Sequence, residues 1–342
     1  MLYNSLKDGI YIIHENEEWI PPFKDAFERA GVPFDEILLT EGSISLDSPP
    51  PHGVFWSRLS ASSHTRSHAM SKEYGRAILG WLEHYGRRVV NGLSVLEFEI
   101  SKINQYLMLK KYGFVTPKTV AVFGRFDLIP NARTLTPPFI SKHNQGGKGL
   151  GVRRFDSHEE FADYVNGSEF EEPIDGITLL QEYVLTKEFF ITRCEFIGSR
   201  FFYAVRVDTS AGSFELCPAD SCNVQDRLPG IAGAACEVPK PAIAGAACEV
   251  GPGASKFTLR EDITESDPLI VRLQRFLIEQ NIQVAGVEFM ETADGRKVVY
   301  DINTNTNYNS AVENALRSQG KKGAADRVVE YLHSELRAQQ DK

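Results

Sequence analysis

Apolar and polar positions are grouped along the chain in blocks that predict a mixed α/β protein. Short apolar runs at 9–14, 37–39 and 54–56 have the length of strands, and an amphipathic stretch at 21–30 ends at Gly31. This β-α-β order predicts a small α/β unit at the N-terminus. Helical periodicity returns at 74–85 and at 96–112, and each of these stretches is followed by a glycine.

Beyond residue 115 strand patterns dominate. The expected elements are strands at 116–120, 139–142 and 179–184, a hairpin over 189–207, a helix capped by Ser157, and helices at 269–279 and 324–336. We divide the chain into an N-terminal unit (1–95), a central unit (96–185) and a C-terminal unit (186–342). An octapeptide at 231–238 recurs at 243–250 within a loop of about 223–256, and we assign it no chemistry.

Residues 286–303 read as two strands joined by Asp294-Gly295, a strong hairpin signal. A two-residue type I′ turn there would place Glu288 opposite Asp301. It would also place Phe289 opposite Tyr300 on the apolar face, because side chains alternate along a strand. Asn303 would then lie on the same face as the two acids.

Two carboxylates paired in this way lie roughly 5 Å apart at Cβ and repel each other. Carboxylates and an amide oxygen are hard ligands, which suits Mg²⁺ that carries substrate phosphates, with Mn²⁺ as an alternative. The acids of an ordinary solvent-exposed hairpin face are the other interpretation of this pair.

A glycine-rich stretch, Gly146-Gly147-Lys148-Gly149-Leu150-Gly151, follows the strand that ends at Lys142. It matches neither the P-loop nor the dinucleotide fingerprint. Glycines nevertheless let backbone N–H groups approach phosphate oxygens, and two lysines add positive charge. A phosphate loop together with a Mg²⁺ site indicates a nucleoside triphosphate.

Composition narrows the class of protein. The 342 residues carry a formal net charge of −9, which argues against a general nucleic-acid binder. The five cysteines form no C-x-x-C pair, so we expect a reduced, cytoplasmic protein. The sequence shows no signal peptide and no apolar run long enough for a membrane span.

Taken together, these motifs resemble the ATP-grasp fold, and most closely the RimK-like carboxylate–amine ligases. The resemblance covers about 54–309. It is carried by Ser57-Arg58-Leu59-Ser60-Ala61-Ser62, Gly86 to Gly92, Ser101-Lys102, Thr116 to Thr119, Lys142 with the glycine loop, Gln181 to Val184, Lys187-Glu188, and Glu288 with Asp301-x-Asn303. It implies an α/β (α+β) fold with an N-terminal pre-ATP-grasp α/β subdomain, a central subdomain and a C-terminal antiparallel-sheet lobe. ATP would bind between the last two.

The resemblance also implies a nucleotide site. Lys102 and Lys142 would contact the phosphates, and Glu188 would hold the ribose, although it could equally be a surface acid. The glycine loop would close over the phosphates, and a strand end would read adenine; the residues concerned are Gly146, Gly147, Lys148, Gly149, Gln181, Glu182, Tyr183 and Val184. Glu288, Asp301 and Asn303 would hold Mg²⁺.

Catalytic and substrate-binding residues follow from the same resemblance. Arg206, with Arg193 as a second candidate beside Lys142, would steady the transferring phosphoryl group, unless these arginines are ordinary sheet residues. Arg58, Ser62 and His64 would face the substrate, and Arg58 could bind a carboxylate with two hydrogen bonds.

The implied activity is the joining of a carboxylate to an amine through an acyl phosphate, with an amino acid or peptide as substrate. A small-molecule kinase on the same scaffold and a non-catalytic ATP-binding protein are the alternatives. The sequence departs from the family in two places: Ser101 stands where Asp usually precedes the lysine, and Asp301 stands where Glu is usual. Neither the exact substrates nor the oligomeric state follows from the sequence.

Overall fold

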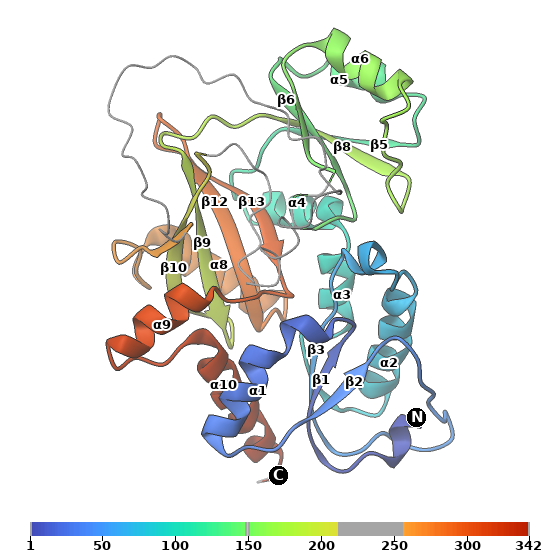
Figure 1. The fold of residues 1–342 in the computed structure, drawn as a ribbon, viewed down its shortest axis with the longest axis vertical. Coiled ribbons are helices and arrows are strands. Elements are labelled where there is room, and N and C mark those ends of the chain that lie inside the picture. Colours follow the sequence, from blue (N-terminus) through green and yellow to red (C-terminus); the bar gives the residue numbers. More distant parts are fainter. Residues whose placement is uncertain (1, 148, 150, 211–255, 341–342) are drawn as a thin grey trace, which may run out of the picture.

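The computed structural model describes residues 2–147, 149, 151–210 and 256–340, and it contains three β-sheets with helices packed around them (Figure 1). The predicted mixed α/β class is confirmed. Lys148 and the duplicated octapeptide lie outside the described residues. Of the helices in the described ranges, none is long and apolar enough to cross a membrane.

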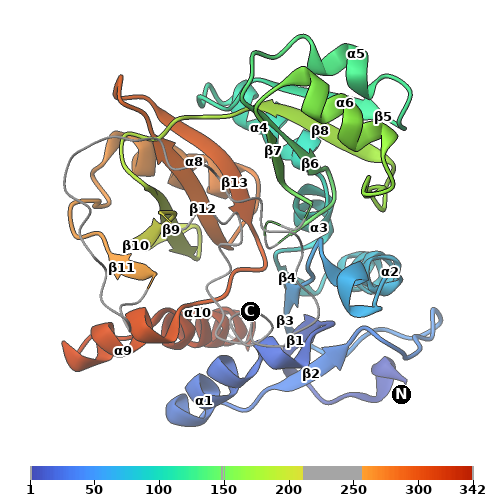
Figure 2. The same ribbon diagram turned by 45° about the horizontal axis from the view of Figure 1, so that its top comes forward.

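A parallel four-stranded sheet in the order β2-β1-β3-β4 forms the N-terminal unit. Its elements are β1 (Gly9–His14), α1 (Pro21–Ala30), β2 (Asp35–Leu38), β3 (Gly53–Arg58), α2 (Ser71–His84) and β4 (Arg88–Val90). Trp56 packs toward α1 and α10 (Ala324–Gln340), whereas Phe55 packs toward α2. Both faces are therefore covered, which explains why these strands are continuous apolar runs. The last helix, α10, lies against α1, so the end of the chain completes the N-terminal unit (Figure 2).

The central unit is a four-stranded antiparallel sheet in the order β5-β8-β6-β7. Its elements are α3 (Leu93–Glu99), α4 (Lys102–Lys111), β5 (Thr119–Phe123), α5 (Leu128–Ala132), β6 (Phe139–His143), β7 (Arg153–Phe155), α6 (His158–Asn166) and β8 (Ile177–Glu182). The single helix expected at 96–112 is wrong: the chain breaks into α3 and α4. Ser101 is extended there, and its side chain caps α4 by accepting a hydrogen bond from Asn104 N. Ser and Asp are both good N-caps, so the family departure at this position keeps the cap.

A five-stranded antiparallel sheet in the order β11-β10-β9-β12-β13 forms the C-terminal unit. Its elements are β9 (Phe190–Ile197), β10 (Arg200–Asp208), β11 (Phe257–Leu259), α8 (Pro268–Glu279), β12 (Val284–Glu291), β13 (Lys297–Asn303) and α9 (Ser310–Ser318), followed by α10. One face packs on α8 through Phe289 and Phe276, while the opposite face meets α9 and α10. The predicted turn at Gly198-Ser199 joins β9 to β10, and both of its residues have positive φ.

The hairpin of β12 and β13 pairs Glu288 with Asp301, as predicted, but by a different route. The loop has three residues rather than two, because Thr292 N donates to Arg296 O at 3.0 Å and Gly295 has φ 81°. A β-bulge beyond Glu288 then adds one residue to β13 and restores the expected register. The predicted pairing of Phe289 with Tyr300 is wrong, since Phe289 faces Val299 and Tyr300 turns toward Glu288.

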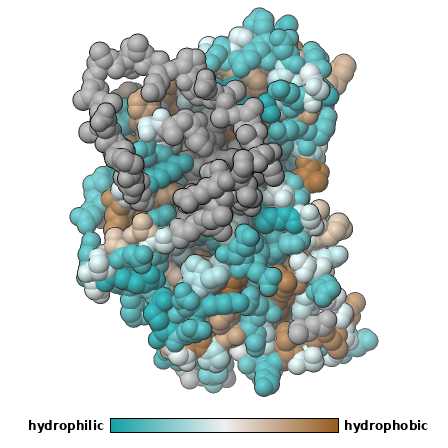
Figure 3. Space-filling view, viewed as in Figure 1, coloured by the Kyte–Doolittle hydropathy of each residue, from teal (hydrophilic) through white to brown (hydrophobic). Residues whose placement is uncertain are grey.

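Hydrophilic residues predominate among the coloured residues on the face shown in Figure 3, and hydrophobic residues are scattered there.

Candidate active site

The acidic pair lies on one face of the C-terminal sheet, at the side nearest the central unit. Glu288 and Asp301 occupy directly paired positions on β12 and β13. Asn303 follows on the same strand face and donates from Nδ2 to Asp301 Oδ2 at 3.2 Å, and Tyr300 donates its hydroxyl to Glu288 Oε2 at 2.6 Å. Three oxygen-bearing side chains thus converge as the sequence predicted.

Each acid pairs with its own cation. Arg193 Nη1 lies 2.6 Å from Glu288 Oε1, and Lys102 Nζ forms an ion pair with Asp301. Burial raises the pKa of Glu288, and the charge of Arg193 only partly opposes that shift. Burial acts in the same direction on Asp301, but the Lys102 and Lys142 charges outweigh it and lower the pKa of Asp301. The two acids therefore have unlike environments, with the deprotonated form favoured most strongly at Asp301.

Arg193 packs against Gly286, and the missing side chain of this glycine leaves room for the guanidinium. The two residues lie on adjacent strands, and a Cβ at position 286 would come within 2.5 Å of Arg193 Nη2. The guanidinium also donates to Glu195 Oε1 and Thr306 Oγ1, each at 2.6 Å. Gly286, Glu195 and Thr306 were not predicted from the sequence as site residues. Alternation along β9 could have found Glu195, because it lies on the same strand face as Arg193.

Lys142, on β6, is the third cation near the acidic pair. Its Nζ lies 2.5 Å from the hydroxyl of Tyr106, which donates to Tyr300 O at 2.8 Å. Lys102, Lys142 and Arg193 therefore surround the acidic pair from three elements, α4, β6 and β9.

The glycine-rich loop lies against the N-terminal unit. A Cβ at Gly147 would lie 3.3 Å from Ser62 Oγ, so the loop and residue 62 are in close contact. Gly146 and Gly149 are described as well, and Lys148 is not. Ser62 is buried and accepts a hydrogen bond from Arg66 Nη1 at 3.2 Å. The structure thus brings one predicted substrate residue to the predicted phosphate loop.

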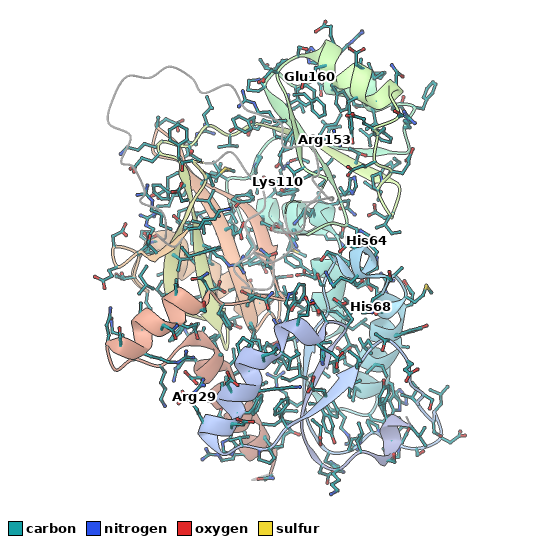
Figure 4. The ribbon with its side chains drawn as sticks, viewed as in Figure 1. Arg29, His64, His68, Lys110, Arg153 and Glu160 are labelled. Atoms are coloured by element: carbon teal, nitrogen blue, oxygen red, sulfur yellow. The ribbon has the colours of Figure 1, made fainter. Side chains whose placement is uncertain are left out.

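His64 lies at the junction of the N-terminal and central units (Figure 4). Its Nδ1 is buried without a hydrogen-bond partner in the described chain. Burial, reinforced by the Lys72 charge, lowers the pKa of His64. A neutral ring that can accept or donate a hydrogen bond is the result.

The predicted adenine-binding segment begins with the last two residues of β8 and runs toward β9. The Gln181 side chain donates to Thr119 Oγ1 at 2.8 Å, and Glu182 Oε1 accepts from Lys118 N at 2.9 Å. Arg154 stacks over the Tyr183 ring at 4.6 Å. These side chains hold the strand end in place, and Glu182 N donates to Lys118 O at 2.9 Å. The prediction that the backbone reads a base therefore rests on Tyr183 and Val184. Glu188 is exposed, and its nearest cation is Arg206 at 3.6 Å.

The structure does not bring Arg206 to the acidic pair. Arg206 pairs with Thr192 on β9, whereas its neighbour Val205 pairs with Arg193, so Arg206 projects from the opposite face of the sheet. Its guanidinium stacks on the Phe190 ring at 4.1 Å and lines an open pocket of about 430 Å³ beside Glu188 and Arg260. Of the two candidate arginines, only Arg193 lies among the site residues.

Arg58 is a structural clamp, and its predicted availability to a substrate carboxylate is wrong. The side chain is 2% exposed. Its Nη1 donates to Trp19 O at 3.2 Å, and its Nη2 donates to Thr306 O at 2.7 Å and to Asn307 Oδ1 at 2.8 Å. Burial lowers the pKa of Arg58 to about 10, which still leaves the group charged at neutral pH.

Arg58→Met is expected to lower the free energy of unfolding by roughly 3 kcal/mol, because buried acceptors lose their donors at about 1 kcal/mol or more each. The KM for a carboxylate substrate should stay unchanged. Urea unfolding and steady-state kinetics test this, with Arg29→Met as the control. Arg29 forms an exposed ion pair with Asp326 whose loss should cost at most about 1 kcal/mol. A raised KM for the carboxylate substrate in a stable Arg58→Met protein would restore the binding role.

Comparisons with known proteins identify the fold. No protein-family model and no curated protein matches the sequence. Among solved structures, the D-cycloserine synthetase DcsG matches with a TM-score of 0.59 and 14% identity over 96% of this chain and 100% of that chain. ATP-grasp ligase PsnB complexed with a minimal precursor matches with a TM-score of 0.61 and 13% identity over 96% and 99%.

A third similar structure is a RimK domain ATP-grasp protein from Sphaerobacter thermophilus, with a TM-score of 0.56 and 14% identity over 94% of this chain and 99% of that one. These likenesses extend over nearly the whole of each chain. The chain therefore has the ATP-grasp fold, as the sequence motifs predicted.

Proposed function

We propose that this chain is an ATP- and Mg²⁺-dependent ligase that joins a carboxylate to an amine. The observation that carries the proposal is the convergence of Glu288, Asp301 and Asn303 with three buried or nearly buried cations from three different elements. The structures similar to this chain include PsnB complexed with a minimal precursor, Mg and ADP, which supports the same pairing of nucleotide and metal.

The donor set fits a magnesium ion that arrives with ATP. Two carboxylates and an amide oxygen are hard ligands, and each carboxylate oxygen keeps a lone pair beyond its present hydrogen bond. Within the described residues no cluster of three or more His, Cys, Asp or Glu could hold a metal alone. Phosphate oxygens and water would complete the coordination, which is usual for Mg²⁺ bound with a nucleotide.

The nucleotide would lie between the central and C-terminal sheets. Lys102 and Lys142 would neutralise phosphate charge, the glycine loop would cover the phosphates, and the 182–184 backbone with Glu188 would hold the nucleoside. Ser62 and His64 would face the second substrate from the N-terminal unit. When bound, Mg²⁺ supplies charge neutralisation at the phosphates.

The chemistry consists of two displacements. An oxygen of the substrate carboxylate attacks the γ-phosphorus of ATP, the bond to the β-phosphate oxygen breaks, and ADP leaves. The amine nitrogen then attacks the acyl carbon, phosphate departs with the C–O bond electrons, and the nitrogen loses a proton. Lys102 and Lys142 would favour both steps by facing the charge that develops on the phosphoryl oxygens. Arg193 is buried and hydrogen-bonded to Glu195, Glu288 and Thr306, so it would act by holding Glu288 in place.

The test measures ADP release with ATP, Mg²⁺ and panels of acids and amines. We expect ADP release that requires both an acid and an amine, with an amide as product. AMP and pyrophosphate would indicate an adenylate, a phosphorylated product without an amide would indicate a kinase, and tight ATP binding without turnover would indicate a regulatory protein. Each of these three results would overturn the proposal.

Arg193→Met should lower kcat by about 100-fold, whereas Arg206→Ala should keep kcat within about threefold of the wild-type value. The two arginines differ because they lie on opposite faces of the sheet. Arg193 contacts Glu288, whereas Arg206 projects away from it. Arg206 is the matched control because it lies one strand away on the same sheet. Steady-state kinetics decide, and a larger loss with Arg206→Ala than with Arg193→Met would reverse the assignment.

A further inference from the structure

The segment 304–309, which directly follows β13, is buried at every position. Its first and third residues are fixed through their side chains. Thr304 donates from its backbone N and from Oγ1 to Glu99 Oε2 at 2.7 and 2.8 Å. Thr306 Oγ1 contacts Glu195 Oε2 at 2.8 Å and Arg193 Nη2 at 2.6 Å, which ties the segment to the acidic pair.

The backbone of the same segment is fixed from the N-terminal unit. Asn91 Nδ2 donates to Thr304 O at 3.0 Å, and Arg58 Nη2 donates to Thr306 O at 2.7 Å. The segment is therefore held on both sides of residue 305. The N-terminal unit holds its backbone, and residues of the central and C-terminal units hold its side chains. A side chain at position 305 is carried by a rigid support next to the site.

Asn305 is the exception within this network. It is 9% exposed, and both its Nδ2 and its Oδ1 are buried without a hydrogen-bond partner among the residues that the structure describes. An amide in this condition has lost its hydration and gained nothing in return, which is unfavourable. A rigid, unpaired amide two residues beyond Asn303 is well suited to a ligand that enters the site.

We propose that Asn305 binds the amine-bearing substrate and selects it by a paired hydrogen bond. This inference rests on the proposed ligase function. Oδ1 accepts from an N–H of the substrate, and Nδ2 donates to a neighbouring carbonyl or carboxylate oxygen. The ligand must therefore offer a donor and an acceptor side by side, as the main chain of an amino acid or of an amino-acid amide does. Asn305 forms no covalent bond and moves no proton.

The experiment compares wild-type protein with Asn305→Leu and Asn305→Ala. ADP release is measured with ATP, Mg²⁺ and an active acid, while free amino acids and the corresponding amino-acid amides serve as the amine in separate arms. We expect the leucine variant to raise the KM for the amine at least about tenfold and to leave the KM for ATP unchanged. If amides work as well as free amino acids, the acceptor read by Nδ2 is a carbonyl; if only free amino acids work, it is a carboxylate.

Thermal stability separates a binding role from a structural one. Leucine removes two unpaired buried polar atoms, so the free variant should have a Tm equal to or above that of the wild type. An amine KM that does not change in Asn305→Leu or, if that variant does not fold, in Asn305→Ala would overturn the inference. The control is Asn131→Leu, since Asn131 is a half-buried asparagine on α5 whose side chain donates to Asp127 O.

Kinetics of the wild-type protein and of the variant distinguish a failure of the ligase function from a failure of the role of Asn305. Wild-type protein that releases no ADP in response to any amine would refute the ligase function. Wild-type protein that is active with an amine, paired with an Asn305→Leu variant of unchanged amine KM, would refute only the role of Asn305.

Discussion

Glu288→Gln and Asp301→Asn are each expected to lower kcat by about 1,000-fold while the protein stays folded. Both changes keep the shape of the side chain and remove its charge. Arg193 would keep its ion pair with Glu195 after the first change, so a buried cation is not left alone. Steady-state ADP release and circular dichroism are the measurements.

The matched control for these acids is Glu291→Gln. Glu291 lies on the same strand, three residues beyond Glu288, and forms an ion pair with Arg260 instead of facing the acidic pair. Its replacement should leave kcat within about threefold of the wild-type value. Full activity in Glu288→Gln, or equal losses in all three variants, would contradict a specific role for the acidic pair.

Gly286→Ala should lower kcat by about 100-fold although residue 286 has no functional group. The added Cβ would lie 2.5 Å from Arg193 Nη2 and 2.8 Å from Cζ, closer than atoms can approach. Residue 286 pairs with β9 on one side and β13 on the other, so the strand cannot withdraw. The guanidinium of Arg193 must move away from residue 286 and lose its contact with Glu288. Overpacking of this kind also costs about 1–3 kcal/mol of stability.

The control for this steric argument is Gly80→Ala. A Cβ at Gly80, inside α2, meets nothing within 4 Å, and alanine should stabilise that helix by about 1 kcal/mol. Kinetics and thermal unfolding of both variants test the point. Wild-type kcat in Gly286→Ala would show that the position of Arg193 does not matter for turnover.

The pairing of Glu288 with Asp301 was predictable because a local sequence pattern determines a hairpin. The predicted and observed hairpins nevertheless differ in two ways that cancel each other. The loop is one residue longer than expected, and a bulge at Tyr300 shifts the register back by one. Without the bulge, Glu288 and Asp301 would not face each other, since a one-residue slip moves a side chain to the other face. The residue types of 297–303 give no indication of the bulge.

Arg206 was favoured over Arg193 because its place after the apolar run 202–205 resembles that of the family's lid arginine, and a bulge in β10 takes it away from the site. At the start of β10, Arg200 pairs with Ile197, and a bulge between Phe201 and Tyr203 then shifts the pairing by one residue. That shift places Arg206 beside Thr192 and on the opposite face from Arg193. The conspicuous arginine at the end of an apolar strand is therefore outside the site.

Long-range contacts were the other part that the sequence could not supply. Two of the three acceptors of Arg58 lie on the segment after β13, about 250 positions along the chain, so its burial cannot be seen from its neighbours. The N-terminal strands and the glycine loop, by contrast, follow from local periodicity and residue type.

The binding of ATP with and without Mg²⁺ tests the central claim most directly. Titration calorimetry of the wild-type protein and of Asp301→Asn gives the dissociation constant under both conditions. If the paired acids hold a magnesium ion that carries the phosphates, Mg²⁺ tightens ATP binding at least about tenfold in the wild type and has little effect in the variant. Equal ATP affinity of the wild-type protein with and without Mg²⁺ would contradict the account.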